Sequence, residues 1–242
     1  MSFFFRMSLA AGIGLFQRPF RKKEILQQLS FVGNGSLMII VFCVCFAAMV
    51  TILESSFHMK MVIQNDSMVP GFAALLILRE LGVVVTALLL TSRVGAGFAA
   101  EVGSMQVTEQ VDALKMLGID PVQYLVSPRL IACVLGSVFL VVIANLTCLF
   151  CAMLVSENSL GYSAQMFLTS MRRFVNFQDL IFAMIKGAVF GAVIPLMSCY
   201  FGFFCKPGAD GVGRATTQSV VFSSIAIIVL DFVLSYTFSF LY

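Results

Sequence analysis

The sequence predicts an all-α integral membrane protein whose 242 residues form a single domain, residues 1–242. Hydrophobic residues make up 60% of the chain and charged residues 11%, and the mean hydropathy is +1.01. In soluble domains about half of the residues are apolar and about a quarter are charged, so this composition excludes a soluble protein. A bilayer core about 30 Å thick needs about 20 apolar residues in a helix. Five windows meet that length and predict five transmembrane helices: residues 33–54, 71–98, 127–155, 179–204 and 216–241.

Residues 1–30 precede the first window and combine an apolar face with a basic segment. Six apolar side chains can share one broad face of a helix: Phe3, Phe4, Phe5, Leu9, Ile13 and Phe16. Four cations follow them: Arg18, Arg21, Lys22 and Lys23. This combination is typical of a helix that lies in the membrane interface. A cleavable signal peptide is not expected, because the positive charges mostly follow the apolar part and no small-residue cleavage site ends it.

The distribution of Lys and Arg between the loops predicts the orientation. With the N-terminus in the cytoplasm, the inside segments hold ten of these residues and the outside segments three, Lys60, Arg172 and Arg173. Because cytoplasmic loops carry the excess of positive charge, the N-terminus is expected in the cytoplasm and the C-terminus on the outer side of the membrane. On that outer side, residues 160–175 are too short and too polar to cross the bilayer. They are expected to form a small amphipathic helix.

The segment "EVGSMQVTEQVDALKMLGIDP", between the second and third windows, is polar and helix-like. Apolar or small residues recur at helical spacing at Val107, Val111, Leu114 and Gly118, while Glu109, Asp112 and Lys115 occupy the other side. Ser104 or Thr108 can cap the start, and Gly118 and Pro121 can end it. The pattern predicts an amphipathic helix of about three turns over residues 104–118, facing the cytoplasm.

Two interpretations of this helix are open from its residues. It can be a connector that floats on the lipid headgroups, or a docking element for a cytoplasmic protein. The segment has four acids, Glu101, Glu109, Asp112 and Asp120, against the single Lys115. Interfacial helices normally carry a face rich in Lys and Arg. The acidic charge therefore favours a protein partner over the headgroup layer.

Four ionisable residues fall inside the predicted spans: Arg79, Glu80, Lys186 and Asp231. At 1.5 Å per residue, the first two lie about 14 Å, Lys186 about 10 Å and Asp231 about 8 Å below the outer surface. Their common depth predicts a polar chamber that opens outward, where the cations can meet a lipid phosphate. Alternatively, they form ion pairs that only hold the bundle together, and Lys186 extends to the surface. Arg93 is expected to anchor the cytoplasmic end of its span and can pair with Glu101.

Other chemistry finds little support in the sequence. The spacings Cys43-Val-Cys45 and Cys148-x-x-Cys151 resemble ligand pairs, but further Cys or His ligands are absent nearby, so the cysteines are interpreted as structural and no metal site is expected. The sequence lacks the pattern G-x-x-x-x-G-K-[ST], so the chain is not expected to bind ATP. With a single histidine, His58, and no plausible nucleophile–base arrangement, catalytic residues are not expected either.

Two longer blocks carry a family resemblance. The stretch "RELGVVVTALLLTSRVGAGFAAEVGSMQVTEQVDALKMLGIDPVQYLVSPR", Arg79–Arg129, closely resembles the signature of the MlaE/YrbE family of ABC-transporter permeases. A second block, "GADGVGRATTQSVV", Gly208–Val221, is similar to that family's cytoplasmic entry to its last span. With similar length and a five-span layout, the resemblance extends over essentially the whole chain.

The resemblance implies a homodimeric permease in a bacterial inner membrane. Its partners would be two cytoplasmic ATPase subunits, which bind the ATP and Mg²⁺, and a periplasmic hexamer of MCE-domain protein. The assembly would move phospholipid between the inner and outer membranes and maintain outer-membrane lipid asymmetry. In such transporters polar residues at the positions matching Arg79, Glu80, Lys186 and Asp231 line the lipid cavity.

The resemblance also assigns a partner to the polar segment. In the family, the helix that matches residues 106–117 docks into a groove of the ATPase. The residues expected to couple the two proteins are Val107, Glu109, Gln110, Val111, Asp112, Leu114 and Lys115. Three alternatives remain for the chain as a whole: an importer of sterols or other hydrophobic molecules, a channel, or a membrane anchor that transports nothing. No nucleic-acid partner is expected.

Overall fold

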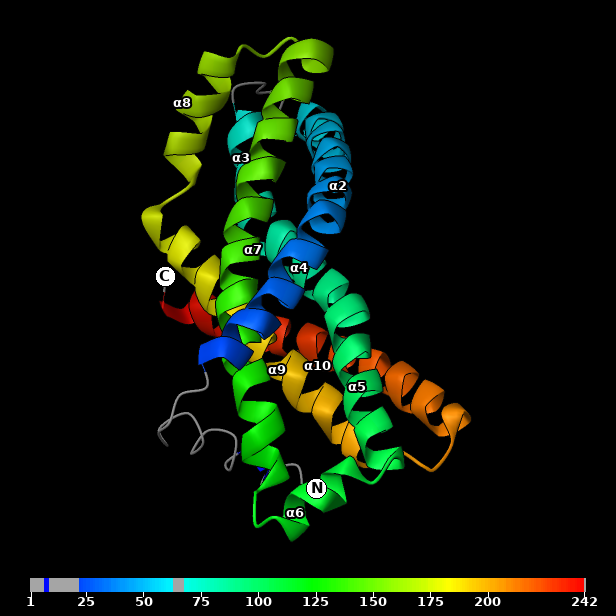
Figure 1. The fold of residues 1–242 in the computed structure, drawn as a ribbon. Coiled ribbons are helices and arrows are strands. Elements are labelled where there is room, and N and C mark those ends of the chain that lie inside the picture. The colour runs from blue at the N-terminus through cyan, green and yellow to red at the C-terminus, as the bar shows by residue number, and fades with distance from the viewer. Residues whose placement is uncertain (1–6, 9–21, 63–67, 242) are drawn as a thin grey trace. The chain divides into compact units, whose positions relative to one another are not determined.

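A computed structural model of the chain describes residues 7–8, 22–62 and 68–241, and in this part of the chain all regular structure is helical (Figure 1). Five helical stretches are long and apolar enough to cross a membrane: Lys22–Met59, Val69–Val107, Pro121–Leu160, Phe177–Phe203 and Ala209–Phe240. Each overlaps one of the five predicted windows, so the prediction of an all-α protein with five such helices is confirmed. The orientation of the termini and the single domain over residues 1–242 stay predictions.

The helices have the following bounds. The first span is α2 (Lys22–Val62), and the second contains α3 (Val69–Leu76), η2 (Ile77–Leu81), α4 (Gly82–Leu90), η3 (Thr91–Gly95) and α5 (Ala96–Val107). They are followed by α6 (Gln110–Met116), α7 (Pro121–Leu160), α8 (Ala164–Phe174), α9 (Phe177–Phe203) and α10 (Ala209–Leu241). The segments η2 and η3 are π-helical turns within the second span.

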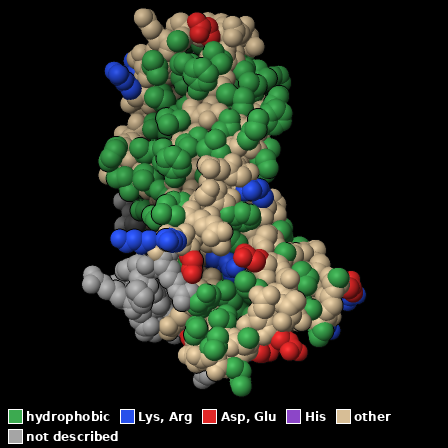
Figure 2. Space-filling view, in the orientation of Figure 1, with side chains coloured by type: hydrophobic (Ala, Val, Ile, Leu, Met, Phe, Trp, Pro, Cys, Tyr) green, Lys and Arg blue, Asp and Glu red, His purple; other side chains and the backbone are tan. Residues whose placement is uncertain are grey.

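The outer surface of the long helices is apolar. Exposed large side chains include Phe42 and Phe46 on α2, Phe139 on α7 and Phe232 on α10. Figure 2 shows hydrophobic side chains over much of one face. Acyl chains solvate such a surface, whereas water would not, which is consistent with a multi-pass membrane protein.

The residues described in the structure group into two compact units. Unit one contains those up to Ser36, the range Ala87–Ser137 and those from Ala188 onward. Unit two contains the described residues of Leu37–Thr86 and the range Val138–Gly187. The first four spans contribute segments to both units, whereas α10 belongs to unit one.

Unit one is centred on close contacts between α5, α7 and α9. Val102, Val126 and Cys199 form a buried cluster, with one residue from each helix. A Cβ atom on Gly202 would lie 2.7 Å from the Cβ of Val102, so glycine is needed where α9 approaches α5 this closely. The side chain of Ser219 on α10 donates a hydrogen bond to Ser198 on α9, with 2.9 Å between the two oxygens.

In unit two, the short helix α8 packs on α3. The amide of Gly71 donates to Ser170 Oγ at 3.0 Å, and a Cβ atom on Gly71 would lie 2.4 Å from the Phe174 ring. Ser163 caps the start of α8 by accepting a hydrogen bond from the amide of Met166. The helix predicted over residues 160–175 therefore exists, although residues up to Leu160 still belong to α7.

The predicted interfacial helix and basic segment, residues 1–30, lie largely outside the described residues. Residues 1–6 and 9–21 are among those left undescribed. From Lys22 onward the segment is not separate, because Lys22 and Lys23 are the first residues of α2.

Candidate functional site

Two of the predicted site residues, Arg79 and Glu80, lie in the π-helical turn η2. A π-helical turn inserts an extra residue into the helix, and such turns are frequent at functional sites. Here the turn interrupts an otherwise apolar helix between Leu76 and Gly82. Both ionisable side chains therefore project from the same π-helical turn of the second span.

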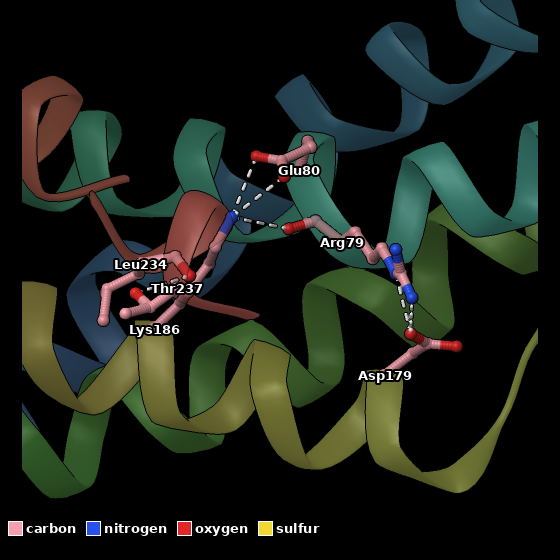
Figure 3. Close-up of polar contacts among 6 residues, drawn as sticks. All are labelled: Arg79, Glu80, Asp179, Lys186, Leu234 and Thr237. Carbon is pink, nitrogen blue, oxygen red and sulfur yellow. Dashed lines mark hydrogen bonds and ion pairs between the residues drawn. The ribbon is translucent and has the colours of Figure 1, made fainter. Parts of the chain in front are cut away.

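Arg79 and Glu80 are adjacent in sequence but contact two different places on α9. Figure 3 shows the two side chains extending away from each other, Arg79 toward Asp179 and Glu80 toward Lys186. Asp179 and Lys186 are seven residues apart, or about 10 Å along a helix. All four residues belong to unit two. Together they form two ion pairs, which we call the charged pairs.

The first charged pair joins Arg79 to a carboxylate that also begins a helix. Arg79 Nε donates to Asp179 Oδ1 at 2.7 Å, and Arg79 Nη2 lies 2.6 Å from the same oxygen. Asp179 Oδ2 accepts a hydrogen bond from the amide of Asn176 at 2.8 Å. The Asp179 side chain is 1% exposed. Asp179 therefore satisfies a free amide at the start of α9 while it compensates the arginine.

The second charged pair buries a lysine completely. Lys186 Nζ donates to Glu80 Oε1 at 3.0 Å, to Glu80 Oε2 at 2.9 Å and to the carbonyl oxygen of Arg79 at 3.2 Å. The Lys186 side chain is 0% exposed, whereas that of Glu80 is 41% exposed. The ammonium also lies 5.0 Å from the centroid of the Phe182 ring. The exposed fraction of Glu80 gives a polar ligand access to the edge of this pair.

Three of the four residues that the sequence singles out belong to one compact unit. Arg79, Glu80 and Lys186 meet in unit two, whereas Asp231 lies in α10, within unit one. Sequence reasoning missed Asp179, which it used only to mark the start of a span. Its signal was present, because an acid in the first turn of an apolar helix, seven residues before a buried lysine, can serve both as a cap and as a counter-ion.

Unit two also contains an apolar cavity of about 460 Å³. Its lining residues come from α2 and α3: Val50, Thr51, Glu54, Ser55, His58, Met59, Phe72 and Leu76. Leu76 immediately precedes the π-helical turn that carries Arg79 and Glu80. Glu54 and His58 form an exposed pair at 3.3 Å. The volume is in the range of small-molecule sites and suits a flexible apolar group.

The polar segment 104–118 is not one helix, so that prediction was wrong. It is broken at Thr108 and Glu109, where Glu109 has a φ of 59° and begins α6 as its N-cap. Helix α5 ends at Val107, and α6 ends in a turn at Gly118, whose φ is +73°. The amides of Gly118 and Ile119 donate to carbonyls of the last turn, which confirms the predicted glycine stop.

Despite the break, the apolar side chains at helical spacing are more buried than the charged ones, as that spacing predicts. Val111 is buried, while Glu109, Gln110 and Asp112 are exposed. Lys115, also exposed, lies 2.7 Å from Asp112. Val107 and Leu114 are half-buried. Two further apolar side chains, which periodicity alone did not select, are largely exposed at the end of α6: Met116 at 88% and Leu117 at 74%.

The cations near the other ends of the spans are paired within unit one. Arg93 donates from Nη1 to Ser36 Oγ at 2.7 Å and to the Phe31 carbonyl at 3.2 Å, so it fastens the second span to α2. It does not take Glu101 as its partner. Glu101 Oε2 instead lies 2.9 Å from Arg129 Nη2, and the Arg129 side chain is only 4% exposed. The pairing suggested by sequence proximity was therefore wrong.

With this geometry, comparisons with known proteins identify the family. The sequence model of the family described as Permease MlaE matches residues 25–237. The chain belongs to the MlaE permease family. The predicted resemblance is thus confirmed, and this MlaE-family chain is a transport component of an ABC transporter rather than a catalytic enzyme.

Individual relatives agree with this membership. The chain is 37% identical over 231 residues to a "Probable ABC transporter permease protein" of Rickettsia felis, covering 96% of this chain and 89% of the relative. It is 34% identical to a probable ABC transporter permease protein of Synechocystis, with 92% and 84% covered. The chloroplastic protein TRIGALACTOSYLDIACYLGLYCEROL 1 of Arabidopsis thaliana is 38% identical, with 88% and 61% covered.

Proposed function

We propose that this MlaE-family permease moves phospholipid between the inner and outer membranes, driven by ATP hydrolysis in a partner ATPase, and so maintains outer-membrane lipid asymmetry. The observation that carries the proposal is the pair of features in unit two: a 460 Å³ apolar cavity ending at Leu76 and the charged pairs at Arg79 and Glu80 that follow it in sequence. A phospholipid has the matching parts, apolar chains and an anionic phosphate. The Arabidopsis relative, whose name contains a diacylglycerol lipid, supports a lipid substrate class.

The proposed roles follow from exposure. Arg79, whose side chain is 28% exposed and already bound to Asp179, is proposed as the cation that meets the lipid phosphate. Lys186 is 0% exposed and would act through Glu80, whose carboxylate it orients. Asp231 on α10 is proposed as a fourth member of the lipid site, on the family resemblance. The cavity would hold part of an acyl chain.

The proposed partners lie at the two ends of the spans. A dimer of cytoplasmic ATPases, which would bind ATP and Mg²⁺, is expected at α6 and the adjoining turn, where Glu109, Asp112, Met116 and Leu117 are exposed. A periplasmic MCE-domain hexamer is expected on the opposite side of a bacterial inner membrane, where α8 presents the cations Arg172 and Arg173. This placement keeps the predicted topology, with a cytoplasmic N-terminus and a periplasmic C-terminus.

A second copy of the chain is proposed to pack against α10. Of the five spans, α10 has the smallest buried share. Phe232, Tyr236 and Phe240 form an exposed aromatic row along it, with ring centroids 6.2 Å and 5.3 Å apart. In a bilayer, a Tyr236→Cys variant should therefore cross-link two copies upon oxidation, while Phe139→Cys on α7 should not. Equal yields of dimer from both variants would contradict this interface.

Filling the apolar cavity tests the function itself. Leu76→Trp should reduce ATP-dependent lipid transfer between vesicles roughly tenfold, since the indole would displace about two methylene groups of an acyl chain, each worth about 0.8 kcal/mol. The co-purified lipid, measured by mass spectrometry, should fall with it. Met38→Trp, at a position of α2 that is 83% exposed, is the matched control. Full transfer by Leu76→Trp in an assembled complex would refute the proposed site.

The alternatives give different results in the same system. Sterol among the co-purified lipids, without glycerophospholipid, would indicate an importer of hydrophobic molecules. Ion conductance by the reconstituted chain without its ATPase would indicate a channel. A non-transporting anchor predicts that changes at Glu80 and Lys186 leave transfer intact.

A further inference from the structure

Cysteines from two separate sequence pairs meet in unit two. Cys45 on α2 and Cys151 on α7 place their sulfur atoms 2.8 Å apart, although they are 106 positions apart in the chain. This distance is shorter than an ordinary contact between two sulfur atoms. A disulfide bond is about 2.05 Å long, so closing the bond requires an approach of about 0.8 Å.

A third thiol lies one helical turn away. Cys148 precedes Cys151 by three residues on α7, and its sulfur atom donates to the carbonyl oxygen of Val44, the residue before Cys45, at 3.4 Å. This contact fixes α7 against α2 at the level of the two facing sulfur atoms. Cys45 is half-buried and Cys151 is buried, with 6% of its surface exposed. A metal site is not favoured, because the described residues contain no group of three or more His, Cys, Asp or Glu that could hold an ion.

We propose that Cys45 and Cys151 form an oxidisable thiol pair that can join α2 to α7 through a disulfide. The direct contact of two sulfur atoms from different helices is the starting geometry from which a disulfide can close. The interpretation of these cysteines as purely structural is revised accordingly. On the predicted topology both lie in the half of their spans that ends on the periplasmic side, where disulfides persist.

The reaction can be written with a membrane-permeant azo compound as the oxidant. One thiol, as its thiolate, adds to a nitrogen of the N=N bond and forms an S–N bond. The second sulfur then attacks the first sulfur, which forms the S–S bond and breaks the S–N bond. Two S–H bonds break and one S–S bond forms. The electron pair and two protons end on the two nitrogen atoms as a hydrazine. Because the attacking group is a thiolate, the reaction should accelerate as the pH rises.

The test uses the full-length permease in native membranes. Samples are treated with the azo oxidant, remaining thiols are alkylated, and non-reduced digests are analysed by mass spectrometry. The number of alkylatable thiols should fall from seven to five, and a peptide linked through Cys45 and Cys151 should appear. A reductant should restore all seven. Retention of seven thiols, or linkage of Cys45 to Cys148 instead, would overturn the assignment.

Single substitutions identify the pair. Cys45→Ala and Cys151→Ala should each abolish the linked peptide, whereas Cys43→Ala, two positions away on α2, should leave its yield unchanged. A further variant keeps Cys45, Cys148 and Cys151 and replaces Cys43, Cys133, Cys199 and Cys205 with alanine. The link should still form in it, which would exclude relay through the four replaced thiols. Loss of the link in that variant while it remains folded would count against the direct pair.

Discussion

Glu80→Ala is expected to cost about 3–5 kcal/mol in stability, because it leaves the ammonium of Lys186 buried without its carboxylate. Lys186 is 0% exposed and donates to both oxygens of Glu80. The carbonyl of Arg79 also accepts a hydrogen bond from this ammonium, but it carries no compensating charge. Thermal unfolding of the purified protein in detergent measures this effect, and lipid transfer should fall to background.

The double variant Glu80→Ala/Lys186→Met separates stability from function. It removes the buried charge together with its partner, so most of the lost stability should return. If the charged pairs serve the lipid, transfer should stay at background in the stable double variant. If they only hold the helices together, transfer should return with stability, and the proposed substrate site would be wrong.

An exposed ion pair is the matched control. Asp210 and Arg214 on α10 lie 3.0 Å apart with side chains 84% and 72% exposed. Pairs of this kind contribute about 0–1 kcal/mol, so Asp210→Ala should leave both unfolding and transfer nearly unchanged. A large effect in this control would mean that loss of any ion pair disturbs the assay.

The spans could be predicted because they depend on a property averaged over many residues. About 20 apolar residues in succession leave few alternatives in a bilayer, and small errors at the ends do not matter. Depth arithmetic also placed Arg79, Glu80 and Lys186 at a similar level, which their contacts in unit two agree with. Which side chains meet across helices could not be predicted in the same way, since the rotation of each helix about its axis depends on packing.

The failures have local physical causes. Val107 and Val111 keep helical spacing across Thr108 and Glu109, so periodicity cannot reveal a two-residue turn between them. The left-handed conformation of Glu109 carries no glycine or asparagine signal. The sequence likewise contains no pattern that predicts the two π-helical turns. Glu101 was matched to the nearer Arg93, although the buried Arg129 needs a carboxylate more.

Reversing the charge of the acids at the start of α6 is expected to release the ATPase. Glu109 and Asp112 are exposed, so Glu109→Lys/Asp112→Lys should change folding stability little. Like charges brought together at a protein interface cost several kcal/mol, and each 1.4 kcal/mol lowers affinity tenfold. A pull-down should therefore recover at least about tenfold less ATPase. Unchanged recovery would favour a connector on the headgroups.

The conformation of Glu109 allows charge to be separated from backbone shape. Glu109→Gly removes the carboxylate but relaxes the residue at φ 59°, where glycine has no steric penalty. If the turn alone positions α6 for docking, Glu109→Gly and Glu109→Lys should both bind the ATPase about as well as the native chain. If the acid itself contacts the ATPase, both should bind less. Glu157→Lys, at an exposed acid near the far end of α7, controls for a general effect of added positive charge.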